Sequence, residues 1–487
     1  METEEPKVPT STPASEPTSH STKPRFAKRT LVIGGVAAVL VLAAGAFAVK
    51  GAMNDRKVAE SDRNRQAQQD ARDREESERQ RKIAEATPFP SPTFVAPSPI
   101  ATPKVFDPLS NDPVEVGKYL SHDACVNEGS KKLNHPYMMP SDLGIIVPMG
   151  LTAGGHVTPV DHQYYFGKNI SLGKDAYNVY APSDGTLVDV QVRPKAGGGA
   201  DYRGVISYSC TFFSYFDLAT SLDTSITSQL PAGWETKSGP QAVKIALKEG
   251  QVIAKVGGQS LDIAVWDTTK KLTKLLVPKA YANLEPWKMH TVKPLDYYTD
   301  SLKAQVLPLY ARSVEPRDGV LDYDVDGFAV GNWFKKGTNG YIGAFTETTY
   351  NSDTYADGHL SIASDLYDPK GWIFSTGAVA HGTQYAIKAP SVAPDALDQS
   401  KGLVKYTLVQ IERKDQTGKS WVSGSIPTSL TLDTNVVVKG VALVQVTGTR
   451  EMKVEVFPGK TAAQVSAFTS AAITYTRGDE ATTMENK

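Results

Sequence analysis

From residue 104 onward the chain consists of short runs in which apolar and polar residues alternate. Examples are Gly185–Arg193 (GTLVDVQVR), Gly204–Cys210 (GVISYSC) and Leu261–Trp266 (LDIAVW). Turn residues separate the runs, as in Pro182-Ser183-Asp184-Gly185. A period of two residues, bounded by Gly, Pro, Asp and Ser, is typical of strands, so the sequence predicts a mainly β body.

A second set of alternating runs follows residue 316. It includes His359–Ser364 and Val436–Val446. Residues 300–316 link the two sets. We therefore expect two β-rich domains, one at residues 106–300 and the other at residues 316–478.

One uninterrupted apolar run stands apart from this pattern: residues 31–49, LVIGGVAAVLVLAAGAFAV. A helix of this length spans about 28 Å, enough to cross the hydrocarbon core of a bilayer. The run is longer than the apolar core of a signal peptide, and a long tail precedes it. The sequence therefore predicts an uncleaved transmembrane helix. A cleaved signal peptide, with Ala46 and Ala48 before the cut, is the alternative.

The flanks of the apolar run bear on its orientation. Basic residues lie on both sides, in Lys23–Arg29 and in Lys50–Arg65, so the positive charge of the two flanks is nearly equal and gives little preference for either orientation. Residues 50–86 are mostly charged, Gln, Ala and Ser, which predicts a helical or disordered stalk, and residues 87–105 form a Pro-rich linker. This layout favours residues 1–30 as a disordered cytoplasmic tail, with a single pass through the cell membrane and the C-terminal domains outside the cytoplasm.

Composition narrows the choice of partners. The formal net charge is -1, and no basic stripe interleaved with aromatic residues occurs, so nucleic acid is not expected as a partner. The chain has 2 cysteines, Cys125 and Cys210, and they form no CxxC pair. They are either one disulfide, which an extracytoplasmic location permits, or two buried thiols.

The first domain resembles the lysostaphin/LytM-type zinc endopeptidases, which cut cell-wall peptide bridges. The resemblance covers about residues 143–268 and rests on four ordered segments, namely Asp161–Gly167 (DHQYYFG), Val179–Val190 (VYAPSDGTLVDV), Lys248–Gly258 (KEGQVIAKVGG) and Ser260–Asp267 (SLDIAVWD). It implies a β-sandwich or hybrid fold. In that family a His, an Asp four residues later and a terminal HxH pattern supply the zinc ligands and the catalytic imidazole.

The ligand set is degenerate here. His162 matches the first His of the family, but Phe166 stands where its Asp belongs. Ser260 and Asp262 replace the HxH pair, and Asp217 aligns with the catalytic His. No catalytic residue and no cofactor is therefore predicted. The alternative is an altered zinc site in which His156, His162 and Asp262 gather in one cleft.

Two further patterns lie in the second half of the chain. Asp322, Asp324 and Asp326 are spaced as at the start of a calcium loop, although Trp333 occupies the twelfth position, where such a loop needs Glu. A turn stabilised by the Asp side chains is the other interpretation. Trp333 and Phe334 lie beside turn residues, so they either line a ligand groove or pack in the core.

These features predict a membrane-anchored, extracytoplasmic pseudoenzyme that binds or scaffolds the cell envelope. Two alternatives remain open. One is a metal-dependent cell-wall peptidase with an altered site around His162, and the other is a regulator that recruits an active envelope hydrolase. The proposed contacts are with the lipid bilayer through residues 31–49 and with a cell-wall ligand.

Overall fold

The computed structural model describes residues 106–126, 129–195, 198–237, 239–343, 354–422 and 425–478. They belong to one compact unit, Thr102–Lys487. The predicted tail, transmembrane helix, stalk and linker, residues 1–105, lie outside the described residues. Within the described ranges, no helix combines the length and the apolar character that crossing a membrane requires.

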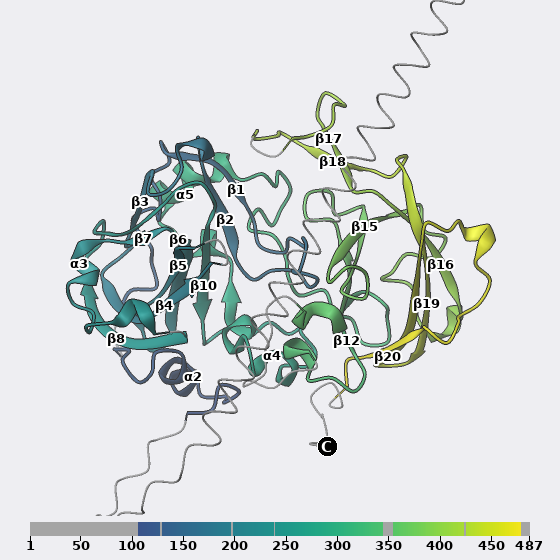
Figure 1. Cartoon of the computed structure of the whole chain (residues 1–487), viewed down its shortest axis with the longest axis horizontal. Coiled ribbons are helices and arrows are strands. Elements are labelled where there is room, and N and C mark those ends of the chain that lie inside the picture. The colour runs from purple at the N-terminus through teal and green to yellow at the C-terminus, as the bar shows by residue number, and fades with distance from the viewer. Residues whose placement is uncertain are drawn as a thin grey trace, which may run out of the picture. The chain divides into compact units, whose positions relative to one another are not determined.

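The first half of this unit is built around an eight-stranded sheet of antiparallel pairs (Figure 1). The order is β1-β2-β10-β6-β5-β4-β8, and β11 pairs with β10. The strands are β1 (Leu143–Val147), β2 (Gln163–Gly167), β4 (Gly185–Pro194), β5 (Ala200–Ser209), β6 (Phe212–Ala219), β8 (Gly239–Leu247), β10 (Leu261–Asp267) and β11 (Thr291–Val292).

Period-two alternation gives this sheet two distinct faces. On the inner face, side chains such as Phe216, Ile263 and Val265 join one large apolar core. A second sheet closes that core from the other side and contributes Val179 and Ile253. Its strands, in the order β3-β9-β7, are β3 (Tyr177–Tyr180), β7 (Ser221–Leu222) and β9 (Val252–Val256).

The second half forms a closed eight-stranded barrel (Figure 1). Its strands in order are β12 (Gly331–Lys335), β13 (His359–Ser364), β14 (Trp372–Thr376), β15 (Thr383–Lys388), β16 (Val404–Val409), β19 (Val438–Gly448), β20 (Glu451–Pro458) and β21 (Ile473–Thr476). The ring closes where Phe334 of β12 pairs with Thr476 of β21. A separate two-stranded sheet joins β17 (Glu412–Asp415) to β18 (Leu430–Asp433). The prediction of a mainly β body is confirmed.

Trp333 and Phe334 are core residues, so of the two roles that the sequence left open the structure supports core packing and not a ligand groove. Trp333 has 0% of its surface exposed and packs inside the barrel, and Phe334 has 2% exposed and packs against Tyr281 and Tyr341. Successive residues of β12 point to opposite faces, and both of these faces are covered.

The predicted calcium-like turn is also corrected, because its carboxylates have separate protein partners. Asp324 accepts hydrogen bonds from the backbone N–H groups of Leu276 and Asn332 and lies 4.0 Å from the guanidinium of Arg477. Asp326 instead forms an ion pair with Arg450. Among the residues that the structure describes, no group of three His, Cys, Asp or Glu side chains could hold a metal ion.

Short helices connect the strands. The α-helices are α2 (Pro113–Leu120), α3 (Thr224–Thr227), α4 (Lys279–Ala282) and α5 (Asp300–Val306). The 3₁₀ helices are η1 (Ile170–Leu172), η2 (Trp234–Thr236), η3 (Pro286–His290), η4 (Pro294–Asp296), η5 (Leu307–Leu309), η6 (Gly340–Ile342), η7 (Tyr355–Gly358), η8 (Gln399–Lys401) and η9 (Ala462–Gln464).

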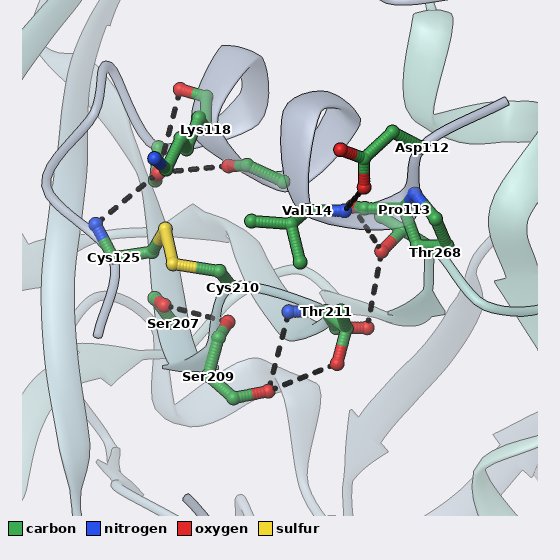
Figure 2. Close-up of a disulfide and its surroundings, with 12 residues drawn as sticks. Asp112, Pro113, Val114, Lys118, Cys125, Ser207, Ser209, Cys210, Thr211 and Thr268 are labelled. Carbon is green, nitrogen blue, oxygen red and sulfur yellow. Dashed lines mark hydrogen bonds between the residues drawn. A yellow bond between two sulfur atoms is a disulfide. The ribbon is translucent and has the colours of Figure 1, made fainter. Parts of the chain in front are cut away.

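Helix α2 covers part of the outer face of the large sheet. Asp112 caps its N-terminus by accepting a hydrogen bond from the N–H of Val114, and Val116 and Leu120 pack on Phe213 and Trp266. A disulfide between Cys125 and Cys210 ties the segment after α2 to the β5–β6 connection (Figure 2). The hydroxyl of Thr268 also donates to the carbonyl of Pro113, so α2 is attached to the sheet at both ends.

Candidate functional site

The outer face of the large sheet carries an unusual concentration of buried charge. Alternation along β6 and β10 places Asp217 and Asp262 on this face, and the strand register sets the two directly opposite each other. Only 5% of Asp217 and 6% of Asp262 is exposed. Two facing carboxylates would repel each other unless each had a compensating partner, and each has one.

The partner of Asp217 is Arg193 of β4. The Arg193 guanidinium donates to Oδ2 of Asp217 at 2.7 Å, and Oδ1 accepts from the N–H of Leu218 at 2.7 Å. Both oxygens of the Asp217 carboxylate therefore have a protein partner. A carboxylate cannot act as the imidazole that the sequence resemblance implies at this position.

The partner of Asp262 is His162, which precedes β2. Nε2 of His162 lies 3.5 Å from Oδ2 of Asp262, and Nδ1 lies 3.1 Å from Oδ1 of Asp161. The imidazole therefore sits between two carboxylates. Its distance to Asp262 is long for a hydrogen bond, and Nε2 has no hydrogen-bond partner among the described residues.

The electrostatics of this pair follow from burial. Burial and, to a smaller extent, the charge of Asp217 raise the pKa of Asp262 to about 7, although His162 opposes the shift. For His162 burial lowers the pKa, but Asp262 and Asp161 outweigh it, so the pKa is raised. Each group therefore shifts the pKa of the other in the direction that favours the charged pair.

Asp161 links this charged pair to a neighbouring aromatic group. Its Oδ2 accepts a hydrogen bond of 2.9 Å from the indole N–H of Trp287 in η3. Trp287 in turn stacks on Trp266, with ring centroids 5.3 Å apart. Burial raises the pKa of Asp161, but Lys288 and His162 outweigh it, so the pKa lies well below its usual range and the residue is an anion.

The structure brings the predicted zinc residues close together but does not complete a zinc site. The ring of His156 lies 5.8 Å from that of His162, in an exposed loop. Phe166 packs in an apolar cluster with Ile145 and Val147. Among the described residues, His162 and Asp262 face each other, and Nε2 of His162 has no hydrogen-bond partner. A structural or catalytic zinc needs at least three protein ligands, and no such group of three is found among the described residues.

A cleft of about 790 Å³ opens on the same outer face, beside the charged pair. Its walls include Arg193 and Arg203 from the sheet, and Trp266 and Trp287, with α2 along one side. Sequence reasoning missed Arg193, Arg203 and Trp287. The first two could have been found, since alternation along β4 and β5 places them on the face of Asp217, but Trp287 lies in the short 3₁₀ helix η3, which has no periodic signal.

Comparisons with known proteins give only distant likenesses. No protein-family description matches the chain, and no curated protein matches it. Among solved structures, the chain is similar to a zinc-containing peptidase from Vibrio cholerae, with 17% identity over 30% of this chain and a TM-score of 0.18. It spans 40% of the length of that peptidase. It is also similar to lysostaphin, with 9% identity over 72% of this chain and 95% of lysostaphin, at a TM-score of 0.19. This is a distant peptidase-like resemblance and carries no further conclusion.

Proposed function

We propose that this chain is a membrane-anchored protein whose sheet half binds material of the cell envelope outside the cytoplasm and does not cleave it. The observation that supports this most directly is the state of the His162 site. The imidazole is flanked by Asp161 and Asp262, and Phe166, which packs among apolar side chains, occupies the position of the Asp ligand. A phenyl ring cannot ligate a metal ion. The segments of the fold are therefore kept, but a zinc ligand is missing.

The layout of the chain supports the location. The apolar run at residues 31–49 is the proposed bilayer anchor, followed by the stalk and the linker. A disulfide between Cys125 and Cys210 suits an oxidising compartment, which also favours a position outside the cytoplasm.

Co-sedimentation with purified, insoluble cell-wall material would test binding. The full-length protein in detergent should be retained by the wall fraction and eluted by soluble wall fragments, while the fragments themselves should keep their mass. Failure of the wall fraction to retain the protein would remove the proposed function. Release of new peptide ends that depends on His162 would replace it with hydrolysis.

A metal hydrolase is the second candidate, and the free Nε2 of His162 favours it. Asp161 holds Nδ1, an arrangement that orients many metal-binding histidines, and Asp262 lies on the opposite side. His162 and Asp262 would then supply two of the three protein ligands that zinc needs, and the ion would act as a Lewis acid. Elemental analysis of the purified protein separates the candidates, since stoichiometric zinc that is lost in His162→Ala would favour the hydrolase.

A further inference from the structure

Arg203 is a buried cation that no carboxylate of the described residues contacts directly, although its charge helps to lower the pKa of Asp161. Only 5% of the residue is exposed. Among the described residues it forms no ion pair, and its Nε has no hydrogen-bond partner. Arg193, the neighbouring arginine on the sheet, differs from Arg203 because it forms an ion pair with Asp217. A buried guanidinium left unpaired costs several kcal/mol, so its retention needs a reason.

Two aromatic rings hold the Arg203 guanidinium in place. Its central carbon lies 4.4 Å from the ring centroid of Tyr215 and 4.5 Å from that of Trp287. Such contacts offset part of the cost of burial and fix the plane of the group, but they leave its Nε–H donor without a partner in the described part of the chain. A rigid guanidinium with unused donors is the feature that recognises planar carboxylates.

A second buried donor without a partner within the described ranges belongs to Trp266, which also lines the cleft. The indole N–H of Trp266 has no partner among the described residues, although only 1% of Trp266 is exposed. Arg203, Trp266 and Trp287 all line the cleft of about 790 Å³. Two unsatisfied donors on the wall of one cleft, one of them charged, form a site for a ligand with oxygen acceptors.

We propose that this cleft binds the free carboxylate of a short peptide, with Arg203 as the anion-binding side chain and Trp266 as the second donor. Aromatic and proline side chains, including Tyr119, Pro240 and Pro286, supply apolar walls for the residues that carry the carboxylate. A cleft of this volume has room for a ligand of a few residues.

The charges around the cleft favour a carboxylate over a phosphate. Its lining also contains Asp123, Asp189 and Glu285. Asp189 is paired with His122, and Glu285 is paired with Lys288. A monoanion balances the single unpaired guanidinium, whereas a dianion would add repulsion from these carboxylates.

Binding of N-acetyl-Ala-Ala to the full-length protein in detergent tests the proposal, with quenching of tryptophan fluorescence as the readout. The matched peptide amide lacks the carboxylate and should bind at least about tenfold more weakly, since a hydrogen-bonded charge contributes on the order of 1.5–3 kcal/mol. Equal binding of acid and amide would overturn the proposal, as would tighter binding of inorganic phosphate.

Variants assign the effect to Arg203. Arg203→Gln should weaken binding of the acid at least about tenfold, and Arg203→Lys, which keeps the charge but loses the planar donor set, should weaken it several-fold. Lys118→Gln removes the same charge from the same cleft and should change binding by about twofold or less. Thermal melts establish that each variant is folded. Unchanged binding in a folded Arg203→Lys or Arg203→Gln variant would refute the role of this residue.

The inference rests on the proposed binding function, and the two can fail separately. If wall material retains Arg203→Gln as well as the parent, the carboxylate site is wrong and envelope binding stands. If the parent binds N-acetyl-Ala-Ala through Arg203 but wall material does not retain it, the site stands and the envelope assignment fails.

Discussion

His162 and Asp262 face each other across two neighbouring strands, with Nε2 of the imidazole 3.5 Å from Oδ2 of the carboxylate. The pair is buried, and 9% of His162 and 6% of Asp262 is exposed. Asp161 holds the other ring nitrogen, and Ser260 donates a hydrogen bond to Asp262. The imidazole and the carboxylate are thus directed at one another.

A double-mutant cycle should show that the two side chains are coupled. We expect His162→Gln and Asp262→Asn each to lower the free energy of unfolding, and the double variant to lose less than the sum by about 1–3 kcal/mol. Urea denaturation at pH 7 measures this coupling. The exposed pair His381–Asp357, whose atoms lie 2.8 Å apart, is the matched control and should couple by less than about 1 kcal/mol. If the losses of unfolding free energy at His162 and Asp262 were additive, the two side chains would not stabilise each other.

Asp318 should make stability fall as pH rises. Burial raises the pKa of Asp318 to about 7, against the hydrogen bonds from Leu295 and Gln163 that lower it. The folded state therefore keeps a proton that the unfolded state releases above about pH 4, so stability declines between about pH 4 and 7, by at most ~4 kcal/mol. Asp318→Asn retains an oxygen acceptor and should make this decline about half as steep in denaturation experiments at several pH values, because Asp262, whose pKa is also raised to about 7, contributes the rest.

Asp184 provides a control of opposite sign for Asp318. It is exposed, and the backbone N–H of Glu249, followed by Lys248, lowers its pKa. Asp184→Asn should therefore leave the decline between about pH 4 and 7 in place. A decline as steep in Asp318→Asn as in the parent would show that Asp318 does not contribute to the pH dependence.

The strands and the charged face were largely predictable from the sequence, because both follow from local alternation. The run Gly185–Arg193 became β4, and Leu261–Trp266 became most of β10. The same alternation puts Arg203 and Asp217 on one face, so the side chains of the site could have been grouped once the strands were paired.

Features set by long-range packing were not predictable. Closure of the barrel depends on the pairing of Phe334 with Thr476, and no local pattern reports it. The same closure buries Trp333, which the sequence left open between groove and core. Arg477 fills the space beside Trp333 from a position after the last strand, where it could equally have been a surface residue.

Arg477 should be essential to the barrel. It is 1% exposed, stacks on the ring of Trp333 at 3.7 Å and donates to the carbonyls of Asn332, Val325, Phe328 and Val330. Lysine cannot reproduce these bonds, so Arg477→Lys should lower the free energy of unfolding by about 2–4 kcal/mol, measured by urea denaturation.

Arg450→Lys is the matched control for Arg477, because Arg450 pairs with Asp326 at the surface. Its cost should stay below about 1 kcal/mol. If the two lysine variants were equally stable, the carbonyl bonds of Arg477 would not matter for the barrel.

The disulfide should hold helix α2 over the outer face of the sheet. It closes a segment with a sequence separation of 85 residues, so the double variant Cys125→Ser with Cys210→Ser should lose about 4 kcal/mol in the chain-entropy account. Release of α2 would also uncover Trp266, on which Val116 and Leu120 pack. Iodide should then quench tryptophan fluorescence more strongly in the variant than in the parent.

Reduction of the parent protein gives an independent check on the role of the disulfide. Dithiothreitol should lower the melting temperature of the parent and leave that of the double Ser variant unchanged, because the variant has no bond to break. If dithiothreitol left the parent unchanged as well, the contacts of Val116 and Leu120 and the bond from Thr268 to Pro113 would be sufficient to fix α2. The cleft beside Arg203 would then keep its α2 wall even in a reducing compartment.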